Sequence, residues 1–65
     1  MKTSREIKRA IKVAFPTLTV SVNTTLKFDK VSKEPLFKIR TRKTFNSVYE
    51  ERLLTIQGVK NTFNL

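Results

Sequence analysis

The sequence predicts an α+β fold: a single small domain of order α-β-β-β-α, with two helices on one face of a short antiparallel sheet. Length is the first reason, because 65 residues suffice for one domain with a thin hydrophobic core. The second reason is that apolar residues recur at helical spacing near the start of the chain. The third is that apolar and polar residues alternate through its middle, as they do in half-buried strands.

A first helix is expected over residues 3–15. Thr3 is suited to cap its N-terminus, and Glu6 completes a capping-box pattern by reaching back to the Thr3 backbone N–H. One apolar stripe follows the helical repeat and consists of Ile7, Ala10, Ile11 and Ala14. Pro16 ends the helix, since proline disfavours helical conformation in the residue before it.

Three strands are expected next, over residues 17–23, 25–31 and 36–43. Their inward-facing residues are expected to be Leu18, Val20, Val22, Leu26, Phe28, Phe37 and Ile39. A loop is the alternative for 25–31, because residues 23–25 form a weak turn without glycine. Residues 32–35 have turn chemistry, and Pro35 is barred from a central ladder.

A second helix is expected over residues 47–57. Ser47 and Glu50 have the spacing of a capping box, and Gly58 fits the left-handed position just past a helix end. The core-facing residues of this helix are expected to be Tyr49, Leu53 and Ile56. The alternative is a strand at 53–56. The adjacent acids Glu50 and Glu51 argue against a strand starting there.

One core is expected to unite these helices and strands. Its members are expected to be Ile7, Ile11, Val20, Val22, Phe28, Phe37, Ile39, Leu53 and Ile56. The tail, residues 59–65, contains three large apolar residues without a clear period, so it either packs across the sheet or contacts a partner. The other face of the sheet is left uncovered in this arrangement.

The sequence contains no Cys and no His. Disulfides are therefore excluded, structural zinc lacks its usual ligands, and acid–base catalysis lacks its commonest group. Glu50 and Glu51 are neighbours, which on a helix would point about 100° apart rather than at one substrate. A single Gly leaves no glycine-rich phosphate loop. We therefore expect no enzymatic activity, no cofactor and no bound metal.

No segment has the roughly 20 consecutive apolar residues that a membrane span requires, and the N-terminus lacks the apolar run of a signal peptide. We therefore expect the protein in the cytoplasm of whatever cell makes or hosts it. Association would add buried surface to so thin a core, and both a folded monomer and a homodimer agree with the sequence.

Charge is the most informative feature of the composition. Fourteen Lys and Arg face five acids, a formal net charge of +9, and twelve of these bases lie in residues 1–43. Self-repulsion on this scale favours an anionic partner. Two groups of cations each follow one element at spacings close to those of successive phosphates. The expected binding residues are Arg5, Lys8, Arg9 and Lys12 on the first helix, and Lys38, Arg40, Arg42 and Lys43 along the third strand.

The strand group is the stronger of these two candidates. A solvated basic helix face is common, whereas cations at alternate strand positions repel each other unless a partner neutralises them. Phe28 and Phe37 are expected inward, and Phe15 and Phe45 at junctions, so no aromatic is expected on the basic face to stack single-stranded bases. Contacts would then be to phosphates of a duplex or structured RNA, with little reading of sequence.

Residues 14–16 (Ala-Phe-Pro), followed by Val20-Ser21-Val22 and preceded by the amphipathic stretch 6–11, resemble a large polyvalent protein-associated domain of phage and plasmid proteins. The resemblance covers roughly the first 25 residues. It implies an origin in a mobile genetic element and carries over no functional residue. The α-β-β-β-α order is also similar to that of double-stranded-RNA-binding domains, a likeness of topology alone.

The expected partner is accordingly nucleic acid or a host protein complex that handles nucleic acid. The implied phage origin suggests the host protein complex as a partner, because small free-standing phage proteins are often inhibitors of host defence enzymes, anti-CRISPR proteins among them. A basic inhibitor would cover an acidic surface of such a complex or compete with its guide or target. Binding to a membrane surface ranks third, because neither expected helix has enough large apolar groups opposite its cations.

Overall fold

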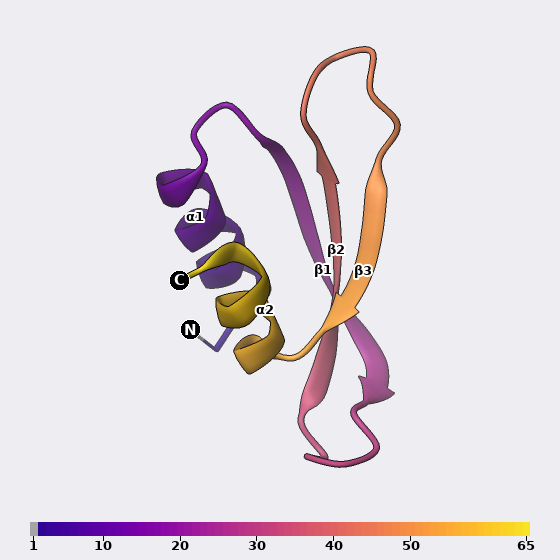
Figure 1. Ribbon diagram of the computed structural model, residues 1–65. Coiled ribbons are helices and arrows are strands. Elements are labelled where there is room, and N and C mark those ends of the chain that lie inside the picture. Colours follow the sequence, from indigo (N-terminus) through magenta and orange to yellow (C-terminus); the bar gives the residue numbers. More distant parts are fainter. Residues whose placement is uncertain (1) are drawn as a thin grey trace.

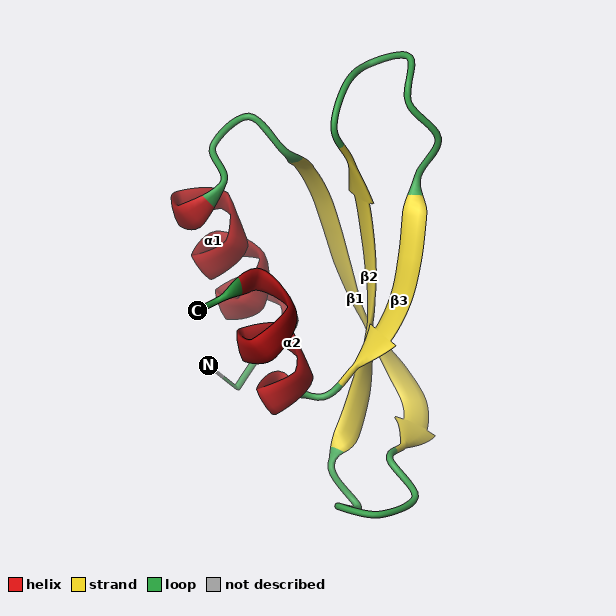
Figure 2. Cartoon of the chain, viewed as in Figure 1, coloured by secondary structure: helices red, strands yellow, loops and turns green. Residues whose placement is uncertain are grey.

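Two helices and three strands follow one another in the order α1 (Ser4–Ala14), β1 (Thr19–Phe28), β2 (Pro35–Arg42), β3 (Glu50–Leu54) and α2 (Ile56–Phe63) in the computed structural model, which describes residues 2–65. The strands form one antiparallel sheet of order β1-β2-β3. Both helices lie on the same face of this sheet (Figures 1 and 2). The predicted α+β class and element order are confirmed, although the second strand, the third strand and the second helix are formed by other residues than expected.

The first helix, α1, agrees closely with its prediction. The Glu6 backbone N–H donates to the Thr3 side-chain oxygen at 3.2 Å, and the Thr3 hydroxyl donates to the Glu6 carboxylate at 3.2 Å. The Glu6 carboxylate thus bonds to the Thr3 hydroxyl, whereas the prediction was a bond to the Thr3 backbone N–H. Ile7 and Ile11, four residues apart, are fully buried against the sheet.

The first two predicted strands are a single strand, β1. Residues 23–25 continue the extended chain, and without glycine they have little preference for the positive φ angles of a tight hairpin turn. The pairing with β2 shifts register between Thr24 and Phe28, where three residues of β1 oppose one of β2. The chain reverses only after Phe28, so the predicted turn at residues 32–35 begins earlier than expected.

Residues 47–57 were predicted to be a helix, and this prediction is wrong. Residues Glu50–Leu54 form β3, which pairs with β2. The adjacent acids do not prevent a strand here, because Glu51 lies opposite Arg40 in the register and Glu50 contacts Arg52 at 3.3 Å. The second helix follows from the predicted tail instead.

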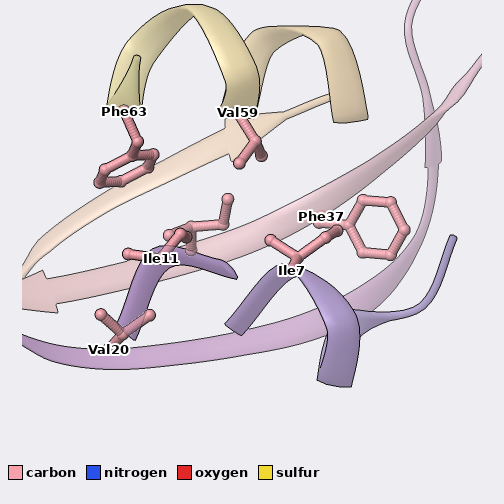
Figure 3. Close-up of a cluster of buried hydrophobic side chains, with 7 residues drawn as sticks. Ile7, Ile11, Val20, Phe37, Val59 and Phe63 are labelled. Atoms are coloured by element: carbon pink, nitrogen blue, oxygen red, sulfur yellow. The ribbon is translucent and has the colours of Figure 1, made fainter. Parts of the chain in front are cut away.

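The tail forms most of α2 and supplies part of the core. The Thr55 side chain caps the helix by accepting from the Gly58 backbone N–H at 3.1 Å, so the expected cap at Ser47 is not used. Val59 and Phe63, four residues apart, are both buried. In Figure 3 their side chains point from α2 towards Ile11. The tail therefore packs into the core between α1 and the sheet and is not a partner-binding appendage.

The core gathers the inward residues of both helices and of β1 and β2. Its buried hydrophobic members are Ile7, Ile11, Val20, Phe37, Ile39, Val59 and Phe63. Of the remaining residues predicted for the core, Val22 and Ile56 pack against it while partly exposed. Phe28 and Leu53 are 61% and 41% exposed, which contradicts their predicted burial. Phe28 lies beyond the helices along β1, and Leu53 lies on the face of the sheet that no helix covers.

Gly58 is the third residue of α2 and has no positive φ, in contrast to the left-handed position predicted for it. A Cβ at this position would lie 3.4 Å from Leu54 Cβ, an ordinary van der Waals contact. We therefore expect Gly58→Ala to raise the free energy of unfolding by about 0.5–1 kcal/mol, because alanine loses less backbone entropy in a helix. Urea denaturation followed by circular dichroism measures this change. A clear loss of stability would contradict the helical assignment of this residue.

Candidate functional site

The face of the sheet opposite the helices carries the predicted strand cations. Along β2, Phe37, Ile39 and Thr41 are buried towards the helices, so Lys38, Arg40 and Arg42 lie on the other face. No helix covers that face in the part of the chain that the structure describes (Figure 2). We call this surface the open face. Its members are Thr19, Ser21, Asn23, Lys38, Arg40, Arg42, Tyr49, Glu51 and Leu53.

The strand register sets the neighbours of each cation. On the β1 side they are uncharged and polar: Asn23 lies opposite Lys38, Ser21 opposite Arg40 and Thr19 opposite Arg42. On the β3 side, Leu53 lies opposite Lys38 and Glu51 opposite Arg40. Three cations thus lie in a row, with hydroxyl and amide groups along one side.

One carboxylate, that of Glu51, lies on the open face among residues 2–65. Its Oε1 is 3.8 Å from Arg40 Nε, and both side chains are about half exposed. Exposed ion pairs of this kind contribute at most about 1 kcal/mol and weaken in salt. Glu51 therefore lowers the positive charge of the open face without cancelling it.

Tyr49 is the residue of this surface that the sequence interpretation missed. It was predicted to face the core, yet its ring centroid lies 4.6 Å from the guanidinium carbon of Arg40 and 4.6 Å from that of Arg42. Phe45 is 5.4 Å from the same Arg42 carbon. The expectation that no aromatic falls on the basic face is therefore wrong. Because the Tyr49 ring already contacts two guanidinium groups, it holds the arginines in place rather than offering a free stacking surface.

Arg42 is oriented by aromatic rings more than by hydrogen bonds. Its Nε is buried, and no acceptor within residues 2–65 bonds to it. Cation–π contacts with Phe45 and Tyr49 fix the plane of the guanidinium group instead. A planar donor fork that is already oriented loses less entropy when it binds an anion.

The other predicted binding residues lie elsewhere. Lys43 follows β2 and lines a cleft on the helix side of the sheet. Arg5, Lys8 and Arg9 are exposed on α1, away from the open face. Lys12 Nζ donates to the backbone carbonyl of Pro16 at 3.3 Å and to that of Leu18 at 2.8 Å, which ties the end of α1 to the following loop. The structure thus brings together three of the eight predicted binding residues.

The cleft has a volume of about 660 Å³ and lies between the ends of the helices, the sheet and the β2–β3 loop. Its lining residues are Phe15, Leu18, Thr41, Lys43, Ser47, Val48, Glu50, Arg52 and Phe63. Glu50, the one carboxylate among them, contacts Arg52 at 3.3 Å.

Fold and surface together define a small α+β domain with one basic, uncovered sheet face. Comparison with protein-family models, with curated proteins and with solved structures finds no match. The resemblance of residues 6–22 to the phage and plasmid domain therefore stays a prediction. Within residues 2–65, no helix is both long and apolar enough to cross a membrane, and no three acidic side chains gather where they could hold a metal ion.

Proposed function

We propose that the protein binds nucleic acid through its phosphates, with the open face as the contact surface. The observation that carries this proposal is the row Lys38, Arg40 and Arg42 on one uncovered strand. Alternate residues of a strand are about 6.6–7 Å apart, close to the separation of successive phosphates in one nucleic-acid strand. Burial of a strand face against a neutral partner would leave these charges desolvated and unpaired, whereas a polyanion neutralises them.

The neighbouring groups favour contacts to the backbone of a duplex or of structured RNA. Hydroxyl and amide side chains at Thr19, Ser21 and Asn23 are suited to donate hydrogen bonds to phosphate oxygens. Tyr49 is engaged by the two arginines, so a stacking platform for single-stranded bases is not offered. We propose that binding is non-enzymatic, because the sequence lacks Cys and His and the one carboxylate of the cleft is paired.

The proposal is tested by Lys38→Gln together with Arg40→Gln. We expect affinity for a duplex of about 20 base pairs to fall at least tenfold, since two charged contacts are removed at about 1 kcal/mol or more each. Fluorescence anisotropy at several salt concentrations measures both the affinity and its salt slope. The slope should decrease by about 0.9 for each phosphate that the variant no longer neutralises.

The matched control is Lys8→Gln with Arg9→Gln on α1. It removes the same charge from two exposed residues, so it should weaken binding only through the general electrostatic field. Circular dichroism confirms that both variants are folded. If the α1 pair lowers affinity more than the β2 pair does, the contact surface is α1. If the protein binds duplexes with no dependence on salt, phosphate binding is excluded.

A second candidate function, inhibition of a host complex that handles nucleic acid, is favoured by a separate observation. Phe45 and Val48 in the β2–β3 loop are each 87% exposed, and the Phe45 ring contacts Arg42 at one end of the open face. Large exposed apolar groups next to cations suit an acidic protein surface with an apolar centre. A pull-down from host lysate with and without nuclease separates the two functions, because a stoichiometric protein partner that survives nuclease supports the inhibitor.

A further inference from the structure

The end of the β1–β2 hairpin, residues 25–35, projects beyond both helices along the long axis of the molecule (Figure 1). We call this segment the arm. Leu26 and Val31 are 98% and 91% exposed, and Phe28 is more than half exposed. Three large apolar side chains in contact with water on one short segment mark an interaction site rather than a part of the core.

The bulge in β1 is held by Thr25. Its hydroxyl donates to the Leu36 carbonyl oxygen at 2.7 Å and accepts from the Lys27 backbone N–H at 3.1 Å. The side chain thus replaces a ladder hydrogen bond at the place where the register shifts. Leu26, between these two anchored residues, lies within the bulge and has its side chain exposed to solvent.

The turn of the arm is held by Asp29. Its Oδ2 accepts from the backbone N–H groups of Ser32 and Val31, at 2.9 and 3.1 Å, and from the Ser32 hydroxyl at 3.1 Å. The bonds from Ser32, followed by that from Val31, lower the pKa of the Asp29 carboxyl. The Asp29 N–H in turn donates to the Glu34 carbonyl at 2.9 Å, and Lys33 adopts a φ of 63° to complete the reversal. The arm is therefore an ordered structure that presents Val31 at its tip.

Cations surround these apolar groups. Lys27, Lys30 and Lys33 are all exposed on the arm, where the carboxylate of Asp29 is occupied by the turn and that of Glu34 is exposed. The row formed by Lys38, Arg40 and Arg42 continues from the arm along β2 towards the other end of the sheet. Exposed cations are thus present both on the arm and along β2, and the arm ends in an apolar tip.

We propose that the arm enters the minor groove of a duplex and places Leu26 and Val31 against a base step, while its lysines contact the phosphates on either side. This inference rests on the proposed nucleic-acid binding by the open face. Aliphatic side chains in the minor groove wedge base steps apart and bend the duplex, whereas single-strand binders stack bases on aromatic rings. A bent duplex can contact the open face along the sheet and the arm at its end.

The test is Leu26→Ser together with Val31→Ser. Both side chains are almost fully exposed, so the fold should be unaffected. We expect affinity for a 30-base-pair duplex to fall about tenfold, and the bend measured by energy transfer between dyes at the duplex ends to disappear. The salt slope should stay unchanged, because no phosphate contact is removed. Val13→Ser, at an exposed aliphatic residue of α1 away from the arm, is the matched control.

The outcomes separate this inference from the function on which it rests. If the unaltered protein binds no duplex, both proposals fail. If Lys38→Gln with Arg40→Gln lowers the salt slope while the arm variant binds and bends the duplex normally, the role of the arm is wrong and the open face stands. If the arm variant instead loses binding to phosphatidylserine vesicles, or turns a dimer into a monomer in sedimentation, the arm serves a lipid surface or a second copy.

Discussion

Replacing Phe63 by alanine is expected to leave much of the protein unfolded at room temperature. Phe63 is 7% exposed, and its ring packs edge-on against Phe15 with the centroids 6.1 Å apart. Removing a buried phenyl ring from a core costs about 3–5 kcal/mol. The whole stability of a 65-residue domain is on the order of 3–10 kcal/mol, so this loss is comparable with the total.

Urea denaturation followed by circular dichroism measures the effect, with Thr62→Ala as the matched control. Thr62 precedes Phe63 in α2 and is exposed, so its replacement should change the free energy of unfolding by no more than about 0.5 kcal/mol. Equal midpoints for the Phe63 variant and the unaltered protein would show that the C-terminal segment lies outside the core.

The neighbouring leucines at the end of β3 are expected to respond very differently to aspartate. Leu54 lies opposite Phe37 and packs against the core, whereas Leu53 lies opposite Lys38 on the open face. Leu54→Asp removes apolar burial and desolvates a carboxylate, so we expect a loss of about 2–4 kcal/mol. Leu53 is 41% exposed, and its replacement by Asp places a carboxylate across from a lysine, so we expect a loss of no more than about 1 kcal/mol.

This pair of variants tests the strand against the helix expected from the sequence. In a helix over residues 47–57, Leu53 is a core residue beside Tyr49 and Ile56. Thermal and urea unfolding of the two variants, compared at one pH near neutrality, give the order of the two losses. A larger loss for Leu53→Asp would contradict β3 and restore the helix.

Local pattern was sufficient for α1 and for the direction of most strand residues. Ile7 and Ile11 are four residues apart, so a helix places both on one face and buries both. The capping residues Thr3 and Glu6 mark where this helix starts. Strand alternation likewise placed Phe37 and Ile39 inward, and therefore Lys38, Arg40 and Arg42 outward. The main row of the candidate site was predictable for the same reason.

The aromatic part of the site was not predictable in this way. Tyr49 meets Arg40 and Arg42 only because β3 pairs with β2, and residues 47–57 also satisfy a helical pattern. For these residues the local preferences for strand and for helix are nearly equal. The contacts that decide between them, such as Glu51 opposite Arg40, join residues that are distant in the sequence.

The sequence by itself determined the α+β class, the N-terminal helix and the face on which the β2 cations lie, because each follows from the spacing of neighbouring residues. Only the tertiary structure decided which late residues form the strand and which form the helix. That choice buries Val59 and Phe63 against α1 and leaves Leu53 partly exposed on the open face. It also decided how far the helices cover the sheet, so that Leu26 and Phe28, apolar in pattern, remain exposed on the arm. Burial depends on what packs opposite a residue, and that partner is set by the whole fold rather than by the local pattern.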